Sequence, residues 1–142
     1  GIFKFQSQFK NHIMISTVTG VAPFVSMIRS IDFKNTDYKI WIFEGASFID
    51  EFGYSNELTS VSKTNEKISF TPTCSRPDDP KNSSWKGVTG RVNKIFSSIY
   101  DLENIEKEDT ILYACGHPDM VSDVEKKYSN KFNFIEEKFW KP

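Results

Sequence analysis

The chain has 142 residues, 38% of them hydrophobic and 15% aromatic, which is enough apolar material for one packed core and therefore for a single domain. Its net charge of -1 argues against nucleic acid or an anionic membrane as the main partner, because neither would attract the chain as a whole. The sequence shows no apolar run long enough to cross a bilayer and no signal-peptide pattern, and Cys74 and Cys115 lack metal-type spacing. We therefore expect a soluble, cytoplasmic protein that holds no metal.

The first elements are a strand and a helix joined by a turn. Gly1 to Phe5 alternates like a short strand, and His12 to Ser16 is a compact apolar run typical of a strand buried on both faces of a parallel sheet. Thr17 to Pro23 then forms a connection in which Gly20 supplies a tight turn and Pro23 begins a helix. A strand, a glycine turn and a helix amino-terminus together form an anion-binding arrangement, since free backbone N–H groups and the helix dipole face the turn.

Two further strands and a helix follow. Lys39 to Phe43 is an apolar strand that ends in a turn at Glu44 to Ser47. Asn56 to Lys63 is predicted to be a short helix, with Ser55 as its amino-terminal cap. Lys67 to Thr71 is the third strand.

A long polar loop, Pro72 to Gly90, follows the third strand, and loops of that size in a compact domain are usually functional or disordered. Arg76 lies just after the strand and Arg91 at the beginning of the next helix. The two side chains can meet over one phosphate group, Arg76 as a bidentate donor and Arg91 beside the helix dipole. The alternative is that both are solvated surface arginines.

The carboxyl-terminal part supplies two more strands. Thr110 to Ala114 is an apolar strand that delivers Cys115 to a turn, and this turn opens directly into a helix at Pro118. Phe132 to Ile135 is a fifth short strand. The aromatic pair Phe139-Trp140, in a polar terminal segment, calls for a partner surface.

Alternating strands and helices predict a doubly wound α/β fold, three-layered α/β/α, around a five-stranded parallel sheet in the order 3-2-1-4-5. This order makes the first and fourth strands neighbours at the switch point, where ligands bind outside the carboxyl ends of the strands. The Gly20 turn and the Cys115 turn therefore flank one cleft.

Residues 115–120 read Cys-Gly-His-Pro-Asp-Met, which resembles the "C-G-x-x-x-M" signature of the pyridine-nucleotide domain of the ferredoxin-NADP reductase family. In that family the cysteine lies beside the nicotinamide. Glu137-Lys138-Phe139 is similar to the family's "E-x-aromatic" ending, which places the glutamate near the nicotinamide and the aromatic residue over the flavin.

Two more segments resemble the same family. Residues 17–24 are similar to its "T-G-T-G-I-A-P-F" phosphate loop, with Val18 in place of the first glycine, and a β-branched residue there narrows the backbone's approach to a pyrophosphate. The "S-R-P…W-x-G…G-R" pattern between Ser75 and Arg91 resembles its adenosine-phosphate segment. Ser75 matters most there, because NADH-using relatives tend to carry an aspartate at that place. Ser47 stands where the family often has an arginine, and we assign it no role.

The resemblance covers nearly the whole chain and implies an NADP(H)-binding domain of a flavoenzyme that passes hydride between nicotinamide and FAD. The flavin then exchanges single electrons with a ferredoxin or flavodoxin-type carrier. Cys115 and Glu137 are implied in the nicotinamide pocket, for positioning and charge complementarity rather than covalent catalysis. For Cys115, a small buried core residue is the alternative. The residues assigned to cofactor binding are Thr17, Thr19, Gly20, Val21, Ala22, Pro23, Ser75, Arg76, Arg91, Gly116, Pro118, Asp119, Met120 and Phe139.

The FAD itself is expected to be held mainly by a flavin-binding domain upstream. A "G-x-F" segment closes the family's flavin-binding barrel, so Gly1-Ile2-Phe3 resembles that junction, with an ordinary edge strand as an equal alternative. Two other functions stay open. One is the same domain in an NADH-dependent oxygenase reductase or a cytochrome b5 reductase-like enzyme, and the other is a nucleotide-sensing interaction module without turnover.

Overall fold

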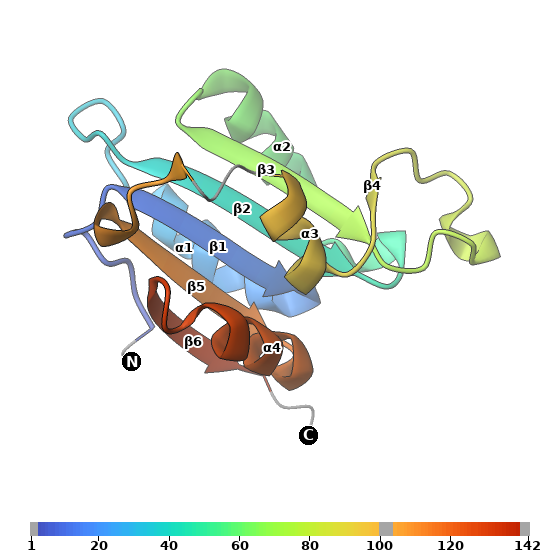
Figure 1. Ribbon diagram of the computed structural model, residues 1–142. Helices are drawn as coiled ribbons and strands as arrows, with labels where there is room; N and C mark the ends of the chain where they lie inside the picture. Colours follow the sequence, from blue (N-terminus) through green and yellow to red (C-terminus); the bar gives the residue numbers. More distant parts are fainter. Residues whose placement is uncertain (1–2, 100–103, 140–142) are drawn as a thin grey trace.

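The computed structural model describes residues 3–99 and 104–139. Its centre is one sheet of six parallel strands in the order β4-β3-β2-β1-β5-β6 (Figure 1). The five long strands have the predicted order, so the fold class is confirmed, and the short β4 adds a sixth strand at one edge. The strands are β1 (Asn11–Thr17), β2 (Lys39–Ala46), β3 (Ile68–Cys74), β4 (Val88–Thr89), β5 (Thr110–Gly116) and β6 (Asn133–Lys138).

Helices cover both faces of the sheet (Figure 1). Residues of α1 (Ala22–Arg29) and α2 (Ser55–Thr64) pack in one core cluster, and residues of α3 (Val92–Ile99) and α4 (Pro118–Tyr128) pack in a second. The strands divide their side chains between the clusters with a period of two; Met14, for example, lies in the first and Ile13 and Ile15 in the second. This is the predicted three-layer arrangement. No helix in residues 3–99 or 104–139 has the length and apolar character needed to cross a membrane.

β2 runs three residues beyond the predicted strand, so the turn expected at Glu44 to Ser47 is wrong. Glu44 pairs with Ser16 of β1, and this continues the ladder to the carboxyl edge of the sheet. Gly45 looked like a turn signal, but a Cβ there would come within 2.8 Å of the Val92 side chain. The glycine serves close packing of α3 on the strand rather than a change of direction. β3 and β6 also extend beyond their predicted ends, to Cys74 and Lys138.

The polar loop after β3 contains more structure than the sequence indicated. A 3₁₀ turn, η3 (Pro80–Asn82), lies in its middle, and β4 near its end pairs with β3 through Thr73↔Val88 and Cys74↔Thr89. Two residues are too few for a periodic signal, so only the neighbouring strand reveals β4.

The strand predicted at Gly1 to Phe5 is wrong for its described part, because Phe3 to Phe5 is not in a strand; Gly1, Ile2 and Trp140 lie outside the described residues. Aromatic packing explains the apolar alternation instead. The Phe5 ring stacks on His12 with centroids 4.2 Å apart, and Phe3 meets the Tyr113 ring edge-on at 6.1 Å.

Helix starts differ in detail from the predicted ones. α1 begins at Ala22, with Pro23 in its first turn, after the 3₁₀ turn η1 (Val18–Val21). The residue that caps α2 is Tyr54, at φ 60°, rather than Ser55, and it makes no side-chain cap hydrogen bond. α4 begins at Pro118 as predicted.

Candidate functional site

The turn after β1 and the turn after β5 touch each other at the carboxyl edge of the sheet. A Cβ on Gly20 would collide with the Cys115 carbonyl oxygen, and a Cβ on Gly116, at φ 136°, would collide with Thr17 Oγ1. The His117 N–H donates to Thr17 Oγ1 at 2.8 Å. The two turns are neighbours, as predicted, and the two glycines allow them to pack directly against each other. They do not flank one cleft in the way predicted, since the pocket described below is lined by the first turn and by no residue of the Cys115 turn.

Cys115 lies opposite Glu137 in the β5–β6 pairing. Burial raises the pKa of the Cys115 thiol to about 12, and the negative charge of Glu137 adds to the effect. The thiol therefore keeps its proton at neutral pH and is a poor nucleophile. Cys115 is fully buried in the core cluster of α1 and α2, as the alternative of a small core residue requires, so any contact it makes with a ligand has to involve its backbone. The Phe139 N–H donates to the Gly116 carbonyl oxygen at 2.8 Å and holds the end of β6 against the same turn.

The first turn of α4 presents backbone rather than side chains to this edge. Met120 is buried in the core cluster of α3 and α4, so any contact it makes with a ligand has to involve its backbone. Asp119 is exposed, and its N–H donates to Nδ1 of His117 at 3.1 Å. His117 thus caps α4, a role that sequence analysis missed although the residue directly precedes Pro118.

A pocket of about 180 Å³ lies between the phosphate loop and the segment before α2. Val18 and Tyr54, at φ 45° and 60°, are the two non-glycine residues with positive φ among the described residues, and both line this pocket. Backbone strain of this kind persists only where the surroundings impose it, and it is frequent at binding sites. The lining residues are Val18, Thr19, Val21, Ala22, Glu51, Gly53 and Tyr54.

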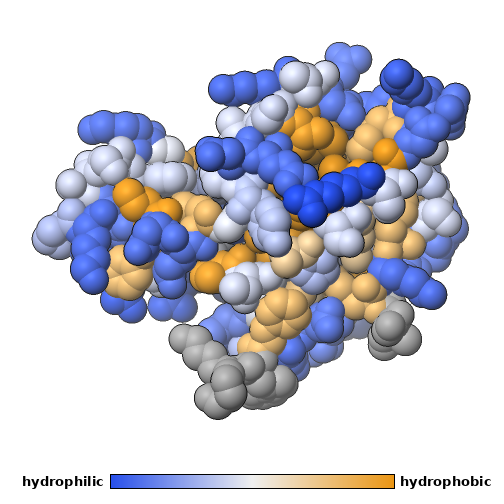
Figure 2. Space-filling view, turned by 180° about the vertical axis from the view of Figure 1, so that it is seen from behind, coloured by the Kyte–Doolittle hydropathy of each residue, from blue (hydrophilic) through white to orange (hydrophobic). Residues whose placement is uncertain are grey.

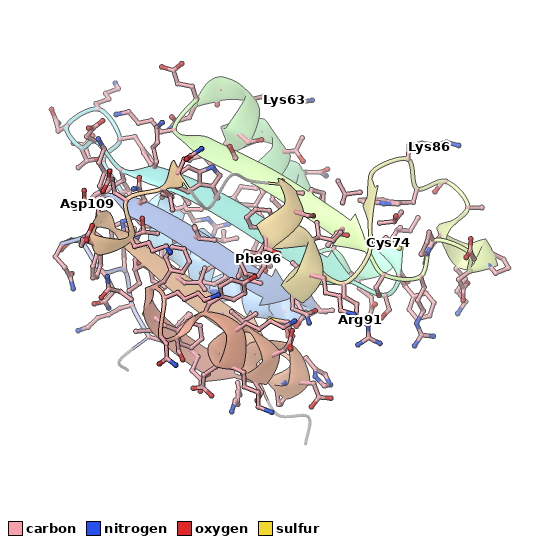
Figure 3. All side chains as sticks on the ribbon, in the orientation of Figure 1. Lys63, Cys74, Lys86, Arg91, Phe96 and Asp109 are labelled. Atoms are coloured by element: carbon pink, nitrogen blue, oxygen red, sulfur yellow. The ribbon has the colours of Figure 1, made fainter. Side chains whose placement is uncertain are left out.

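The ends of β3 and β4 bring the predicted phosphate-reading residues to one edge. Cys74 pairs with Thr89, and the Gly90 N–H donates to the Cys74 carbonyl oxygen at 2.9 Å. Arg76 and Arg91 each lie two residues beyond the paired residues Cys74 and Thr89, so both follow the same edge of the sheet. Figure 3 shows Arg91 pointing outward beside the beginning of α3, while Lys86 projects from the opposite side of the loop.

Arg76 and Lys81 share one aromatic partner that sequence analysis missed. The Arg76 guanidinium carbon lies 5.5 Å from the centroid of the Phe48 ring, and Lys81 Nζ lies 5.3 Å from it. Ser75 Oγ lies 3.4 Å from Ser47 Oγ, so Ser47 also belongs to this cluster. Phe48 and Lys81 sit in different loops, and no sequence spacing signals their contact. In Figure 2, which looks onto the opposite side from Figure 1, the loop after β3 projects as a largely hydrophilic lobe.

Glu44 is a buried carboxyl group that no motif indicated. It is fully buried, and within the described part of the chain neither carboxylate oxygen has a hydrogen-bond partner. Burial raises the pKa of Glu44 to about 8, and the nearby backbone N–H of Gly53 offsets this only in part. No group of three or more His, Cys, Asp or Glu side chains in residues 3–99 and 104–139 is arranged to hold a metal ion.

Comparison with known proteins gives the family of the chain. Residues 14–126 match the oxidoreductase NAD-binding domain family. The chain is 29% identical to ferredoxin–NADP reductase B of Sorangium cellulosum, over 78% of the chain and 44% of that protein. It is 28% identical to a subunit of the Na(+)-translocating NADH-quinone reductase of Pseudoalteromonas atlantica, over 76% of the chain and 26% of that protein. It thus spans less than half the length of both relatives.

A solved structure with the same fold is the ferredoxin NADP+ reductase of Neisseria gonorrhoeae with bound FAD and NADP. The two share 20% identity at a TM-score of 0.69, over 94% of this chain and 57% of that one. The family match extends over most of the chain, and it includes the phosphate loop, the two arginines and the Cys-Gly turn. The chain belongs to the oxidoreductase NAD-binding domain family, as an NAD(P)-binding domain of the ferredoxin-NADP reductase type.

Proposed function

We propose that this domain binds NADP(H) and presents its nicotinamide to an FAD held by a flavin-binding domain of the same protein. The observation that carries the proposal is the paired end of β3 and β4, which Ser75 and Arg76 follow on one strand and Arg91 follows on the other. The flavin would exchange electrons with a ferredoxin or flavodoxin-type carrier, since this chain is similar to ferredoxin–NADP reductases.

NADP differs from NAD by one 2′-phosphate, so selectivity has to come from donors at the place where that group binds. An aspartate at position 75 would repel the phosphate, whereas Ser75 can donate to it. Hydrogen bonds to charged groups contribute about 1.5–3 kcal/mol each, and two exposed arginines, discounted for solvent screening, contribute roughly 3 kcal/mol. This corresponds to a preference on the order of a hundredfold for NADP.

The other half of the nucleotide would lie along the joined turns. The backbone from Thr17 to Pro23 would hold the pyrophosphate beside the pocket, and Cys115 and Glu137 would orient the nicotinamide. The bound cofactor supplies the hydride. The role of Cys115 and Glu137 would be to orient the nicotinamide and to complement its charge. Covalent catalysis is not part of this proposal, because the Cys115 thiol stays protonated at neutral pH.

Isothermal titration calorimetry of the protein with NADP and with NAD tests this proposal. Arg76→Ala should weaken NADP binding at least about tenfold and NAD binding little, and the NADP affinity should fall as salt is added, because the contact is ionic. Lys86→Ala removes the same charge from the opposite side of the loop and should leave the preference intact. Equal dissociation constants for NADP and NAD in the parent protein would overturn the phosphate-reading role.

The second candidate is an NADH-dependent reductase domain, as in an oxygenase reductase or a cytochrome b5 reductase-like enzyme. It is favoured by the 28% identity to part of an NADH-quinone reductase. The same titration separates the two, since this candidate requires NAD to bind at least as tightly as NADP. A nucleotide-sensing module is distinguished by binding without any hydride transfer in the protein that includes its flavin domain.

A further inference from the structure

We infer that Asn82 is a positioning residue that sets the selectivity for NADP over NAD, because it holds Arg76 and Phe48 in a preformed phosphate-binding pair. This inference rests on the proposed function and adds to it a residue that touches no ligand. Asn82 is the last residue of η3 and is only 1% exposed, although it lies in the most polar loop of the chain.

The Asn82 side chain satisfies three backbone groups from two separate loops. Its Nδ2 donates to the Ser47 carbonyl oxygen at 2.9 Å and to the Arg76 carbonyl oxygen at 2.8 Å. Its Oδ1 accepts from the Ile49 N–H at 3.0 Å. The two carbonyl oxygens can only accept and the N–H can only donate, so the three partners determine the positions of the nitrogen and the oxygen of the Asn82 amide.

These three hydrogen bonds hold the backbone on both sides of Phe48 and the backbone of Arg76, whose guanidinium contacts the Phe48 ring. Ser47 and Ile49 are the residues on either side of Phe48, and the third bond goes to Arg76 itself. Asn82 thus fixes the backbone that carries the Phe48 ring and the backbone that carries Arg76, and the Arg76 guanidinium carbon lies 5.5 Å from the centroid of that ring. Lys81, the neighbour of Asn82, is held at the same ring.

Two cations around one ring repel each other until an anion lies between them, so their approach has to be imposed by the backbone. Without Asn82 the two loops would have to be ordered when the nucleotide binds, and that ordering would weaken affinity. NAD has no 2′-phosphate and gains nothing from Arg76, so its affinity does not depend on this ordering. Loss of Asn82 should therefore reduce selectivity and not binding in general.

The test compares the ratio of the dissociation constants for NAD and NADP in four proteins: the parent, Asn82→Ala, Ile49→Pro and Ile49→Ala. Asn82→Ala removes all three bonds without changing charge. Of the three hydrogen bonds of Asn82, Ile49→Pro removes only the one that the Ile49 N–H donates to Asn82 Oδ1. Position 49 is the first residue of the turn η2 (Ile49–Glu51), where proline is tolerated, and Phe48 already has the extended conformation that a following proline requires. Ile49→Ala trims the same side chain and keeps the N–H.

We expect the ratio to fall about tenfold in Asn82→Ala and to a smaller extent in Ile49→Pro, through weaker NADP binding, and to stay at the parent value in Ile49→Ala. If Asn82 had only a structural role, Asn82→Ala would lower the unfolding temperature and reduce the affinities for NADP and NAD by the same factor. A parent preference that survives in both Asn82→Ala and Ile49→Pro overturns this inference alone, and a parent ratio near one overturns the proposed function together with it. If Asn82→Ala does not fold, the comparison of Ile49→Pro with Ile49→Ala decides.

Discussion

Val18, rather than Gly20, is the residue with the unusual backbone in the phosphate loop. Sequence analysis assigned the tight turn to Gly20, but the positive φ of 45° belongs to Val18. Gly20 is needed for another reason, since a side chain there would strike the Cys115 carbonyl oxygen. A β-branched residue is disfavoured at positive φ, so this loop is strained at the position where the family's phosphate loop has its first glycine.

Val18→Gly should therefore stabilise the protein. Relief of a strained backbone is worth about 1–3 kcal/mol, and the greater freedom of glycine in the unfolded chain costs roughly 0.5–1 kcal/mol, which leaves a net gain of about 1 kcal/mol in the free energy of unfolding. Urea unfolding followed by circular dichroism measures it. Val18→Ala keeps a Cβ and should recover less. A loss of stability in Val18→Gly would contradict the assignment of strain.

We expect the free energy of unfolding to depend on pH because of Glu44. Burial raises the pKa of this carboxyl group from 4.5 to about 8 in the folded protein, so between these values the folded state binds more protons than the unfolded chain and stability falls as pH rises. Glu44→Gln has no proton to lose. It should match the parent near about pH 4 and exceed it in free energy of unfolding by an increasing amount up to about pH 8.

Chemical denaturation across this pH range measures the effect, with Glu66→Gln, an exposed carboxyl group in the turn before β3, as the matched control. A difference between parent and Glu44→Gln that is the same at every pH would show that the charge of Glu44 does not carry the cost.

At the scale of elements, parallel pairing decides which side chains share the site. Cys115 and Glu137 are 22 positions apart in the sequence, and the β5–β6 register makes them direct neighbours. Arg76 and Arg91 follow the paired ends of β3 and β4, each two residues beyond the last pair. The helices contribute mainly by burying their apolar faces, and α4 keeps even Met120 of the Cys-Gly segment in the core.

Cys115→Ala and Glu137→Ala, in the protein that includes its flavin-binding domain, should each lower the rate of hydride transfer, because the proposed function assigns both residues to the orientation of the nicotinamide. Stopped-flow absorbance of the flavin measures the rate. Cys115→Ala also removes a buried atom and should cost about 1 kcal/mol of stability. Glu136→Ala is the control, since neighbouring strand residues point to opposite faces of the sheet. Unchanged rates in both variants would refute the assignment.

At the scale of the molecule, the switch point between β1 and β5 gathers the joined turns at one edge of a three-layer domain. The proposed function assigns to this domain the binding and orientation of a nucleotide. The flavin chemistry would require further groups, which the proposed function assigns to a flavin-binding domain.

We expect the 142-residue chain on its own to bind no flavin tightly and to have negligible reductase activity, because the proposed function assigns the FAD to a separate flavin-binding domain. The absorbance spectrum of the purified protein, before and after addition of FAD, measures this. Protein that purifies with stoichiometric yellow flavin would contradict the expectation, and restored activity on fusion to a flavin-binding domain would support it.

The sequence by itself determined the strand order and the identity of the two turns that meet, because apolar runs such as His12 to Ser16 and Thr110 to Ala114 are local signals of buried parallel strands. It also indicated the arginines of the polar loop. Only the tertiary structure decided where β2 ends, that β4 exists, and that Asn82 and Phe48 both contact Arg76. The physical reason is that these features arise from contacts between segments far apart in the chain, which leave no periodicity or spacing in either segment alone.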